Sequence, residues 1–449
     1  MSIRSNRQTA DSFKSMIAGK QLLPILIGAA LGAGGWMYGL RNGGGFSSGS
    51  DAGLEDQLRI AQEEIGMLGK ENESLRSLAQ GGGEVSVPPE MIASVEKDYG
   101  MQFLSTPVFH RIASEELGYR IEAAIESRMG PQGIDDRNEA YKRIGWLRPE
   151  DSLLDQMVAM RSVGALGWFD EETGDAWVTD RFDLKNIPDQ AAVLRLLVRI
   201  LLNQRFPAPA AYPGDDAARA REALHAGAAS GAETRLFARS AQAIGFIPLK
   251  ENTAAARLLL TLPEFLQGLA MFPAVEGKAF ADTTFVKGVD DFADALRTPP
   301  MNTLEVVFPR EKDRGGKLAI QGIDDEIYLE ESAGYLGLKL WVEEMGDLGL
   351  AGEIAGSWMK DGYVLFADGE TSSGLVWEVK FDSEEAARLF EGMARERIAA
   401  MAGSDKTSSD GDVLEAGERF LRVVRVDPDT VRYLNVATRE TAVKSFEEP

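Results

Sequence analysis

The stretch "VLRLLVRILLNQRF" at residues 193–206 predicts a core helix that carries two arginines on one stripe. Its apolar residues recur with the spacing of an α-helix, so most of its surface should pack against the rest of the fold. Arg195, Arg199 and Asn203 are spaced four residues apart and therefore lie on one face of the helix. Buried or half-buried arginines are seldom left without a partner. The stripe therefore predicts either ion pairs with carboxylates of the fold or a site for an anionic ligand such as a peptide C-terminus.

The composition restricts the classes of protein and of site that this chain can form. Its 449 residues and 44% hydrophobic content are typical of a folded protein with a sizeable core. A formal net charge of −23 argues against nucleic acid as a partner, because phosphate binding needs a positive surface. The absence of cysteine excludes disulfides, thiolate metal sites and cysteine nucleophiles. Only two histidines, His110 and His225, remain as imidazole ligands.

Residues 21–40 form an uncharged, mostly apolar run of the length that a helix needs to cross a bilayer. Arginines and lysines outnumber acidic residues in residues 1–20, and such a basic tail stays on the cytoplasmic side. We therefore expect a single-pass membrane anchor, with the N-terminus in the cytoplasm and the rest of the chain outside it. A cleaved signal peptide is the alternative, although no A-x-A cleavage site is evident.

A short coiled coil is predicted at residues 54–79. Leu58, Ile65 and Asn72 occupy the a positions of its heptads, and the d positions hold leucines and one alanine. A single asparagine at a, with leucine at d, is typical of a parallel two-stranded coiled coil. Glycines spaced as Gly-x-x-x-Gly in the preceding apolar run also favour close pairing of helices. We therefore expect a homodimer formed through residues 21–79.

The remaining chain predicts an α+β fold that is predominantly helical. A hairpin is expected with strands at Trp168–Phe169 and Ala176–Thr179, and we interpret its acidic turn as solvated. Acidic pairs such as Asp215 and Asp216 are interpreted as helix caps and solubilising groups. Two hairpins on either side of a helix predict a C-terminal ββαββ unit. The predicted domains are a basic tail (1–20), a transmembrane anchor (21–40), a linker (41–53), a coiled-coil stalk (54–79), a flexible linker (80–90), a helical globular domain (91–353) and the C-terminal unit (354–449).

Several segments resemble, in sequence and in order, a bacterial family of exported or membrane-attached zinc-metallopeptidase-like proteins of zincin type. The segments are "AYKRIGWLRPED" (140–151), "GWFDEETGDAWV" (167–178), "RLLVRILLNQRF" (195–206), "ALHAGAA" (223–229), "PPMNTLEVVFPREK" (299–312) and "GLVWEVKFDSEEAARLFEGM" (374–393). In that family the third segment is a helix with a His-Glu-x-x-His motif, and the fourth supplies a glutamate as the third metal ligand. The resemblance implies a zincin-like fold for residues 91–353.

The residues that would hold zinc in that family are replaced in this chain. The resemblance places the two histidine ligands at Arg195 and Arg199, the catalytic glutamate at Leu196 and the third ligand at Ala226. A guanidinium stays protonated and has no lone pair for a metal, while leucine and alanine carry no ligand atom. His225 lies next to Ala226, but one imidazole beside two arginines is a poor zinc site. We therefore expect no metal, no other cofactor and no catalytic residue at these positions.

Together these features predict a pseudoenzyme, a metallopeptidase-like protein without the metal. It would sit in the bacterial inner membrane with its globular part in the periplasm, where it would bind, scaffold or regulate an unidentified protein or peptide partner. On the arginine stripe, ion pairs to Glu222 or Glu233 are one alternative, and an anion held by Arg195, Arg199 and Asn203 is the other. A hydrolase or peptidase with a relocated, carboxylate-based metal site is the alternative function.

Overall fold

The structure is a computed structural model that describes residues 83–209, 212–244, 253–311, 314–346, 348–369, 372–403 and 412–444. The chain divides into two compact units that each combine separate stretches of sequence. Unit 1 consists of Met1–Ile121, Arg161–Arg205 and Ala232–Ala256. Unit 2 consists of Glu122–Met160, Phe206–Gly231 and Arg257–Pro449. Four helices have residues in both units, namely α5 (Glu116–Met129), α7 (Leu153–Ser162), α9 (Asp215–Ile244) and α10 (Thr253–Thr261).

The predicted fold class needs a correction, because it included a helix that crosses a membrane. Within the described ranges, the structure holds an α+β fold, and no helix there is both long enough and apolar enough to span a bilayer. Even the largely apolar helix α8 (Ile187–Arg205) contains an aspartate and three arginines. The predicted anchor at residues 21–40, the coiled coil at residues 54–79 and the dimer expected from them lie outside the described residues.

Unit 1 contains a small four-stranded sheet in the order β1-β2-β4-β3. Its strands are β1 (Glu84–Val85), β2 (Phe109–Ile112), β3 (Gly167–Phe169) and β4 (Ala176–Thr179). β2 and β4 are parallel, while β3 and β4 form the predicted hairpin, in which Trp168 lies opposite Trp177. The rings of these two tryptophans stack with their centroids 5.7 Å apart. The sheet is therefore held together across the hairpin by aromatic contact as well as by its ladder.

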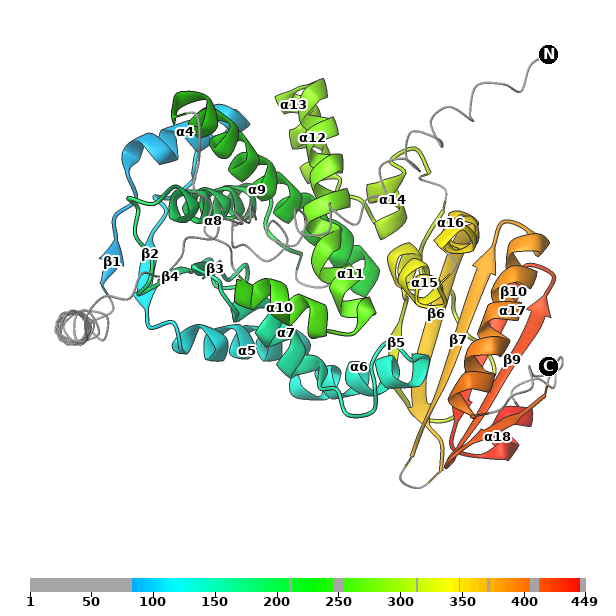
Figure 1. The fold of residues 1–449 in the computed structure, drawn as a ribbon. Coiled ribbons are helices and arrows are strands. Elements are labelled where there is room, and N and C mark those ends of the chain that lie inside the picture. Colours follow the sequence, from blue (N-terminus) through cyan, green and yellow to red (C-terminus); the bar gives the residue numbers. More distant parts are fainter. Residues whose placement is uncertain are drawn as a thin grey trace, which may run out of the picture. The chain divides into compact units, whose positions relative to one another are not determined.

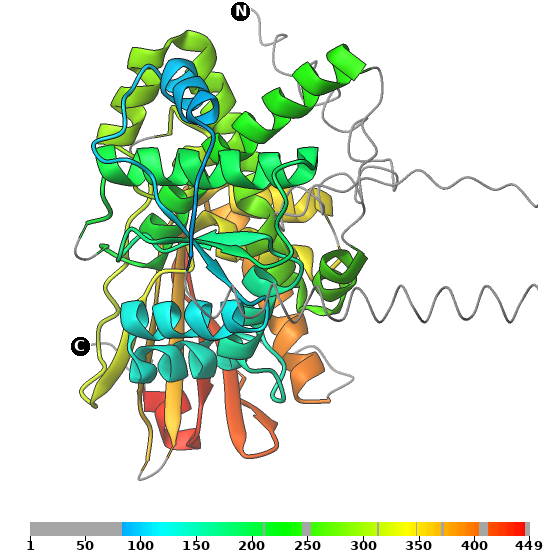
Figure 2. The same cartoon turned by 90° about the vertical axis from the view of Figure 1, so that its left-hand side faces the viewer.

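Helix α8 packs against both the sheet of unit 1 and helix α4 (Pro89–Tyr99) (Figure 1; Figure 2). Eleven of its nineteen residues are buried, as expected for a helix that is apolar on most of its surface. The sheet approaches the helix closely at Gly167, where a Cβ atom would lie only 3.0 Å from Cδ1 of Leu196. A larger residue at position 167 would clash first with the backbone carbonyl oxygen of Trp177 across the hairpin, 2.5 Å from that Cβ position, and would also crowd Leu196.

Unit 2 contains a six-stranded antiparallel sheet in the order β5-β6-β7-β10-β9-β8. Its strands are β5 (Ile327–Glu331), β6 (Trp358–Ala367), β7 (Ser373–Phe381), β8 (Leu414–Ala416), β9 (Arg419–Asp427) and β10 (Thr430–Val436). The sequence predicts only four of these six strands, in a ββαββ unit. The prediction is corrected here, because β5 and β8 extend the sheet at its two edges. β8 has only three residues, and β5 lies before residue 354, where that unit was expected to begin.

Some of the remaining helices of unit 2 pack on this sheet, and others lie away from it (Figure 1). They are α6 (Pro131–Ile144), α11 (Glu264–Phe272), a π-helical turn (Pro273–Gly277), α12 (Lys278–Lys287), α13 (Val289–Arg297), α14 (Thr303–Val307), α15 (Gly334–Glu343), α16 (Leu348–Gly356), α17 (Glu384–Met401) and α18 (Arg439–Lys444). Ser383 caps α17, since its hydroxyl accepts a hydrogen bond from the backbone N–H of Ala386.

One face of the six-stranded sheet carries an aromatic core. The ring of Trp377 on β7 lies 5.6 Å from Trp341 of α15, 5.7 Å from Phe390 of α17 and 6.5 Å from Tyr433 of β10. All four of these side chains are buried. Burial of such large rings contributes much of the stability of a domain, so α15 and α17 are fixed against this face.

The opposite face of the sheet is apolar at one end of the strands and polar at the other. At one end it bears an apolar cluster, formed by Val364, Phe366, Val376, Leu434, Val436 and Ala442. Side chains alternate between the two faces of a strand, so the residues next in line on the same face are Lys360, Glu378, Lys380, Thr430 and Arg432. This polar end of the face lines the groove described below.

Candidate functional site

The arginine stripe of α8 is engaged by carboxylates within unit 1. Nη2 of Arg199 lies 2.7 Å from Oε1 of Glu171, which belongs to the turn of the β3–β4 hairpin. The side chains of Arg199 and Glu171 are 16% and 13% exposed, so this ion pair is largely shielded from water. Nδ2 of Asn203 donates to the backbone carbonyl of Glu171 at 3.0 Å. The hairpin turn is thus anchored to two of the three predicted stripe residues.

The third stripe residue forms the other ion pair. Nη1 of Arg195 lies 3.4 Å from Oε2 of Glu233 on α9, one of the two partners that the sequence predicts. Burial raises the pKa of the Glu233 carboxyl, and the charge of Arg195 opposes that shift. The ion-pair alternative for the stripe is therefore observed for both arginines.

The other positions of the predicted metal site have no ligand chemistry. Leu196 is buried and packs towards β3, so at the position of the family's glutamate it is a core residue. His225 and Ala226 lie on α9 within unit 2, and His225 is buried. The other histidine, His110, lies on β2, with its ring 6.5 Å from that of Trp177. Across the described ranges, no group of three or more histidine, aspartate or glutamate side chains is placed to hold a metal ion.

Glu171 is the residue that the sequence interpretation missed. Its turn, with acidic residues on both sides, was interpreted as solvated, yet the side chain of Glu171 is nearly buried and paired. The remaining turn geometry is as expected, since Asp170 accepts from the N–H of Glu172 at 2.9 Å. The only signal in the sequence was that a fixed positive charge on a core helix needs a nearby carboxylate.

A second polar centre lies inside unit 2, where Asp361 of β6 is fully buried. Its carboxylate accepts five hydrogen bonds within 3.1 Å. The donors are the hydroxyl of Ser332, the backbone N–H groups of Ala333 and Gly334, and the indole N–H groups of Trp358 and Trp377. These five donors come from β6, β7 and the segment at the start of α15, so the carboxylate holds these elements together.

Asp216 on α9 is the second buried carboxylate of unit 2. It accepts from the hydroxyl of Thr303 at 2.7 Å and from the Thr303 backbone N–H at 3.3 Å. Burial raises the pKa of Asp216 to about 7. Arg219 and the Thr303 hydrogen bonds oppose this rise, and Asp361 adds to it. The interpretation of Asp216 as a solubilising group is therefore wrong, because only 5% of the residue is exposed.

Neighbouring charges of unit 2 form a closed ionic network. Arg137 of α6 pairs with Asp215 through Nε and with Glu331 of β5 through Nη2, each at 2.9 Å. The backbone N–H of Asp215 donates to Glu331 at 2.9 Å, and Nη2 of Arg219 donates to the hydroxyl of Tyr141 at 2.6 Å. Every carboxylate in this network has a cationic partner, so the network joins α6, α9 and β5 rather than offering a free acid or base.

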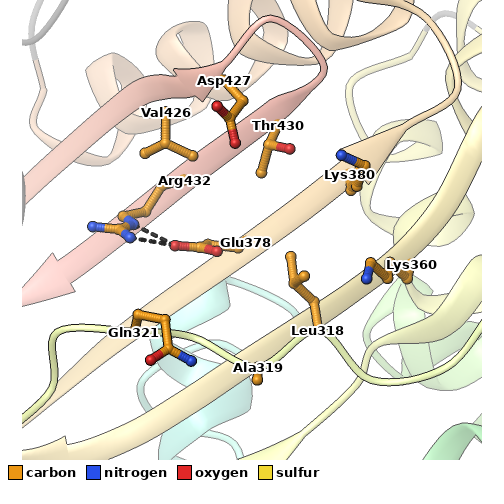
Figure 3. A pocket seen from close by; sticks show the side chains of 10 residues that line it. All are labelled: Leu318, Ala319, Gln321, Lys360, Glu378, Lys380, Val426, Asp427, Thr430 and Arg432. Carbon is orange, nitrogen blue, oxygen red and sulfur yellow. Dashed lines mark hydrogen bonds and ion pairs between the residues drawn. The ribbon is translucent and has the colours of Figure 1, made fainter. Parts of the chain in front are cut away.

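A groove lies on the polar end of the open sheet face in unit 2 (Figure 3). Its volume is about 270 Å³. The floor is formed by β6, β7 and β10, while the loop at residues 318–321 and the end of β9 form the sides. The lining side chains are Leu318, Ala319, Gln321, Lys360, Glu378, Lys380, Val426, Asp427, Thr430 and Arg432.

The loop beside the groove is held against β6 through the backbone. The N–H of Leu318 donates to the carbonyl of Asp361 at 2.9 Å. The next residue of β6 is Gly362, where a Cβ atom would lie 2.1 Å from the carbonyl oxygen of Leu318. Only glycine leaves room for this approach, so the wall of the groove depends on residue 362.

Comparison with known proteins relates only part of unit 2 to a family. Residues 329–445 match the model of a family described as a domain of unknown function, DUF8575. This match covers most of the six-stranded sheet together with α15 to α18. No curated protein and no solved structure matches the chain. The resemblance to zinc metallopeptidases therefore stays a prediction.

Proposed function

We propose that this protein is a non-catalytic binding or scaffolding protein. The observation that carries the proposal is the engagement of Arg199 by Glu171 and of Arg195 by Glu233, at positions where a zincin-type helix would present its metal ligands. Guanidinium groups that are held by carboxylates fill such a position with a structural ion pair. Helix α8 thus serves to join the hairpin and α9 within unit 1.

The same pairs argue against the anion site on α8. An anionic ligand would have to displace Glu171 and Glu233 from arginines whose side chains are only 16% and 18% exposed. Breaking one partner away from a shielded ion pair is costly, so a ligand at this stripe would bind weakly. The groove on the open sheet face of unit 2 is the better candidate for a binding site.

The alternative of a hydrolase with a relocated metal site receives no support from the described residues. Such a site needs two or three carboxylates that face one point without cations between them. The acidic residues that gather in unit 2 are each engaged, Asp215 and Glu331 by Arg137, Asp361 by its five donors and Asp216 by Thr303. These groups hold elements of the fold together.

Metal content and peptidase activity of the purified full chain test the proposal. After dialysis we expect far less than one zinc per chain and no hydrolysis of peptide substrates, with or without added zinc. The variants Arg195→Ala and His225→Ala should leave both results unchanged. About one tightly held zinc per chain that is lost on His225→Ala would overturn the proposal, because it would show a working metal site that includes this imidazole.

A further inference from the structure

The floor of the groove in unit 2 contains a row of hydrogen-bond donors across three neighbouring strands. Lys360 of β6 lies opposite Lys380 of β7, and Lys380 lies opposite Thr430 of β10. Directly opposed like charges destabilise a sheet, so a pair of lysines in this register is unfavourable without an anion. The chain as a whole carries a net charge of −23, so two lysines opposite each other form a local positive patch on an acidic protein.

The charges along the groove are unequally satisfied. Arg432 and Glu378 lie opposite each other in the next row, where Nε of Arg432 donates to Glu378 at 2.6 Å. Nζ of Lys380 lies 3.0 Å from Asp429, and both side chains are about one-third exposed. By contrast, Lys360 has no ion pair to any residue that the structure describes. An exposed pair such as Lys380 with Asp429 is worth little, so Lys380 can exchange its partner for a ligand.

The lining points to a ligand with two parts. Two kinds of cationic side chain bind phosphate in proteins, namely lysine as a point charge and arginine through a fork that fits carboxylate and phosphate alike. The one arginine of the groove is already engaged by Glu378. Leu318, Ala319 and Val426 add apolar surface beside the donors (Figure 3). A volume of about 270 Å³ lies just below the range of about 300–1,000 Å³ that is typical of small-molecule pockets, so it suits only a small ligand.

We propose that this groove binds a small organic phosphate monoester. Lys360 and Lys380 hold the phosphate, and the organic part lies against the apolar side of the loop at residues 318–321. Asp427 lines the groove and Asp429 pairs with Lys380, so both carboxylates oppose the binding of an anion, and Asp429 competes for Lys380. This inference rests on the proposed binding role and names a ligand for it. The two can be tested separately, because metal content and peptidase activity test the non-catalytic role and phosphate binding tests the groove.

Calorimetric titration of the full chain tests the inference, with glycerol phosphate, inorganic phosphate and glycerol as probes. We expect binding of glycerol phosphate, weaker binding of inorganic phosphate and none of glycerol. Lys360→Ala should weaken the binding of glycerol phosphate by about tenfold or more, since it removes a charge-assisted contact. The control Lys339→Ala removes a lysine that pairs with Glu343 on α15, outside the groove, and should change nothing.

A variant with increased affinity distinguishes a direct effect on binding from an effect of misfolding, because misfolding would only weaken binding. Asp429→Asn removes the carboxylate that competes for Lys380 and should tighten the binding of glycerol phosphate. Circular dichroism checks that each variant is folded. Affinities that are equal in the wild type, Lys360→Ala and Asp429→Asn, or an absence of binding at millimolar glycerol phosphate, would overturn the proposed site. Equal affinities for the two phosphate probes would overturn the contribution of the apolar side.

Discussion

Replacing Asp361 with asparagine should destabilise unit 2 strongly, although the two side chains have nearly the same shape. One carboxylate oxygen accepts from Ser332, Gly334 and Trp358, and the other accepts from Ala333 and Trp377. An asparagine offers one carbonyl oxygen and one NH₂ group in their place. Whichever way the amide is turned, its NH₂ group faces at least two donors.

The expected loss follows from those two donors. A buried N–H group that is left without an acceptor costs about 1–3 kcal/mol, so two of them cost roughly 2–6 kcal/mol. The remaining hydrogen bonds also become weaker, because their acceptor is no longer charged. Removal of a buried charge offsets part of this cost, since burial also raises the pKa of Asp361. We therefore expect the free energy of unfolding to fall by about 3 kcal/mol.

Urea unfolding followed by tryptophan fluorescence measures this loss, because Trp358 and Trp377 both donate to Asp361. The matched control is Asp324→Asn, the same substitution at an exposed residue, which should change stability by no more than about 0.5 kcal/mol. If Asp361→Asn lowers the free energy of unfolding by less than about 1 kcal/mol, the five hydrogen bonds do not hold the elements together as inferred.

Three further predictions concern other parts of the fold. Burial raises the pKa of Asp216 to about 7, so the folded state binds the proton of this carboxyl more tightly than the unfolded chain does. The free energy of unfolding should therefore fall as the pH rises from about 4 to about 7. Asp216→Asn should remove that part of the fall in urea titrations at several pH values. Glu171→Gln should cost about 1–3 kcal/mol because it removes the charge that pairs with Arg199, and a double-mutant cycle with Arg199→Leu should show a clear coupling energy. Gly362→Ala should lower the melting temperature and weaken the binding of glycerol phosphate, since a methyl group would displace the carbonyl of Leu318.

Strands with a long alternating pattern were the easiest part of the fold to predict. The segments predicted as two hairpins overlap β6, β7, β9 and β10, each of which has at least seven residues. β8 has three residues and gives no periodic pattern, while β5 shows mostly exposed residues at a sheet edge. Such strands form because they can make backbone hydrogen bonds to a neighbouring strand, and a single sequence does not show which strand will be the neighbour.

The sequence predicts that the arginines of unit 1 form ion pairs, but it identifies only one of their two carboxylate partners. Arg195 and Glu233 were matched because a core arginine needs an acid and few acids occur on α9 near the expected contact. Glu171 escaped because a turn that also contains Asp170 and Glu172 has the composition of any solvated loop. Only the packing of the hairpin on α8 distinguishes Glu171 from its neighbours.

Charge alone therefore does not separate structural from ligand-binding residues in this protein, whereas pairing does. Arg195 and Arg199 form the most conspicuous pattern in the sequence, yet each is matched by a carboxylate and contributes to the fold. Lys360 and Lys380 are separated by nineteen other residues and form no pattern at all until β6 and β7 place them opposite each other. A like-charge pair across two strands costs stability, and the proposed anion would offset that cost. Because Asp429 compensates only Lys380, the ligand of the groove should be sought through Lys360.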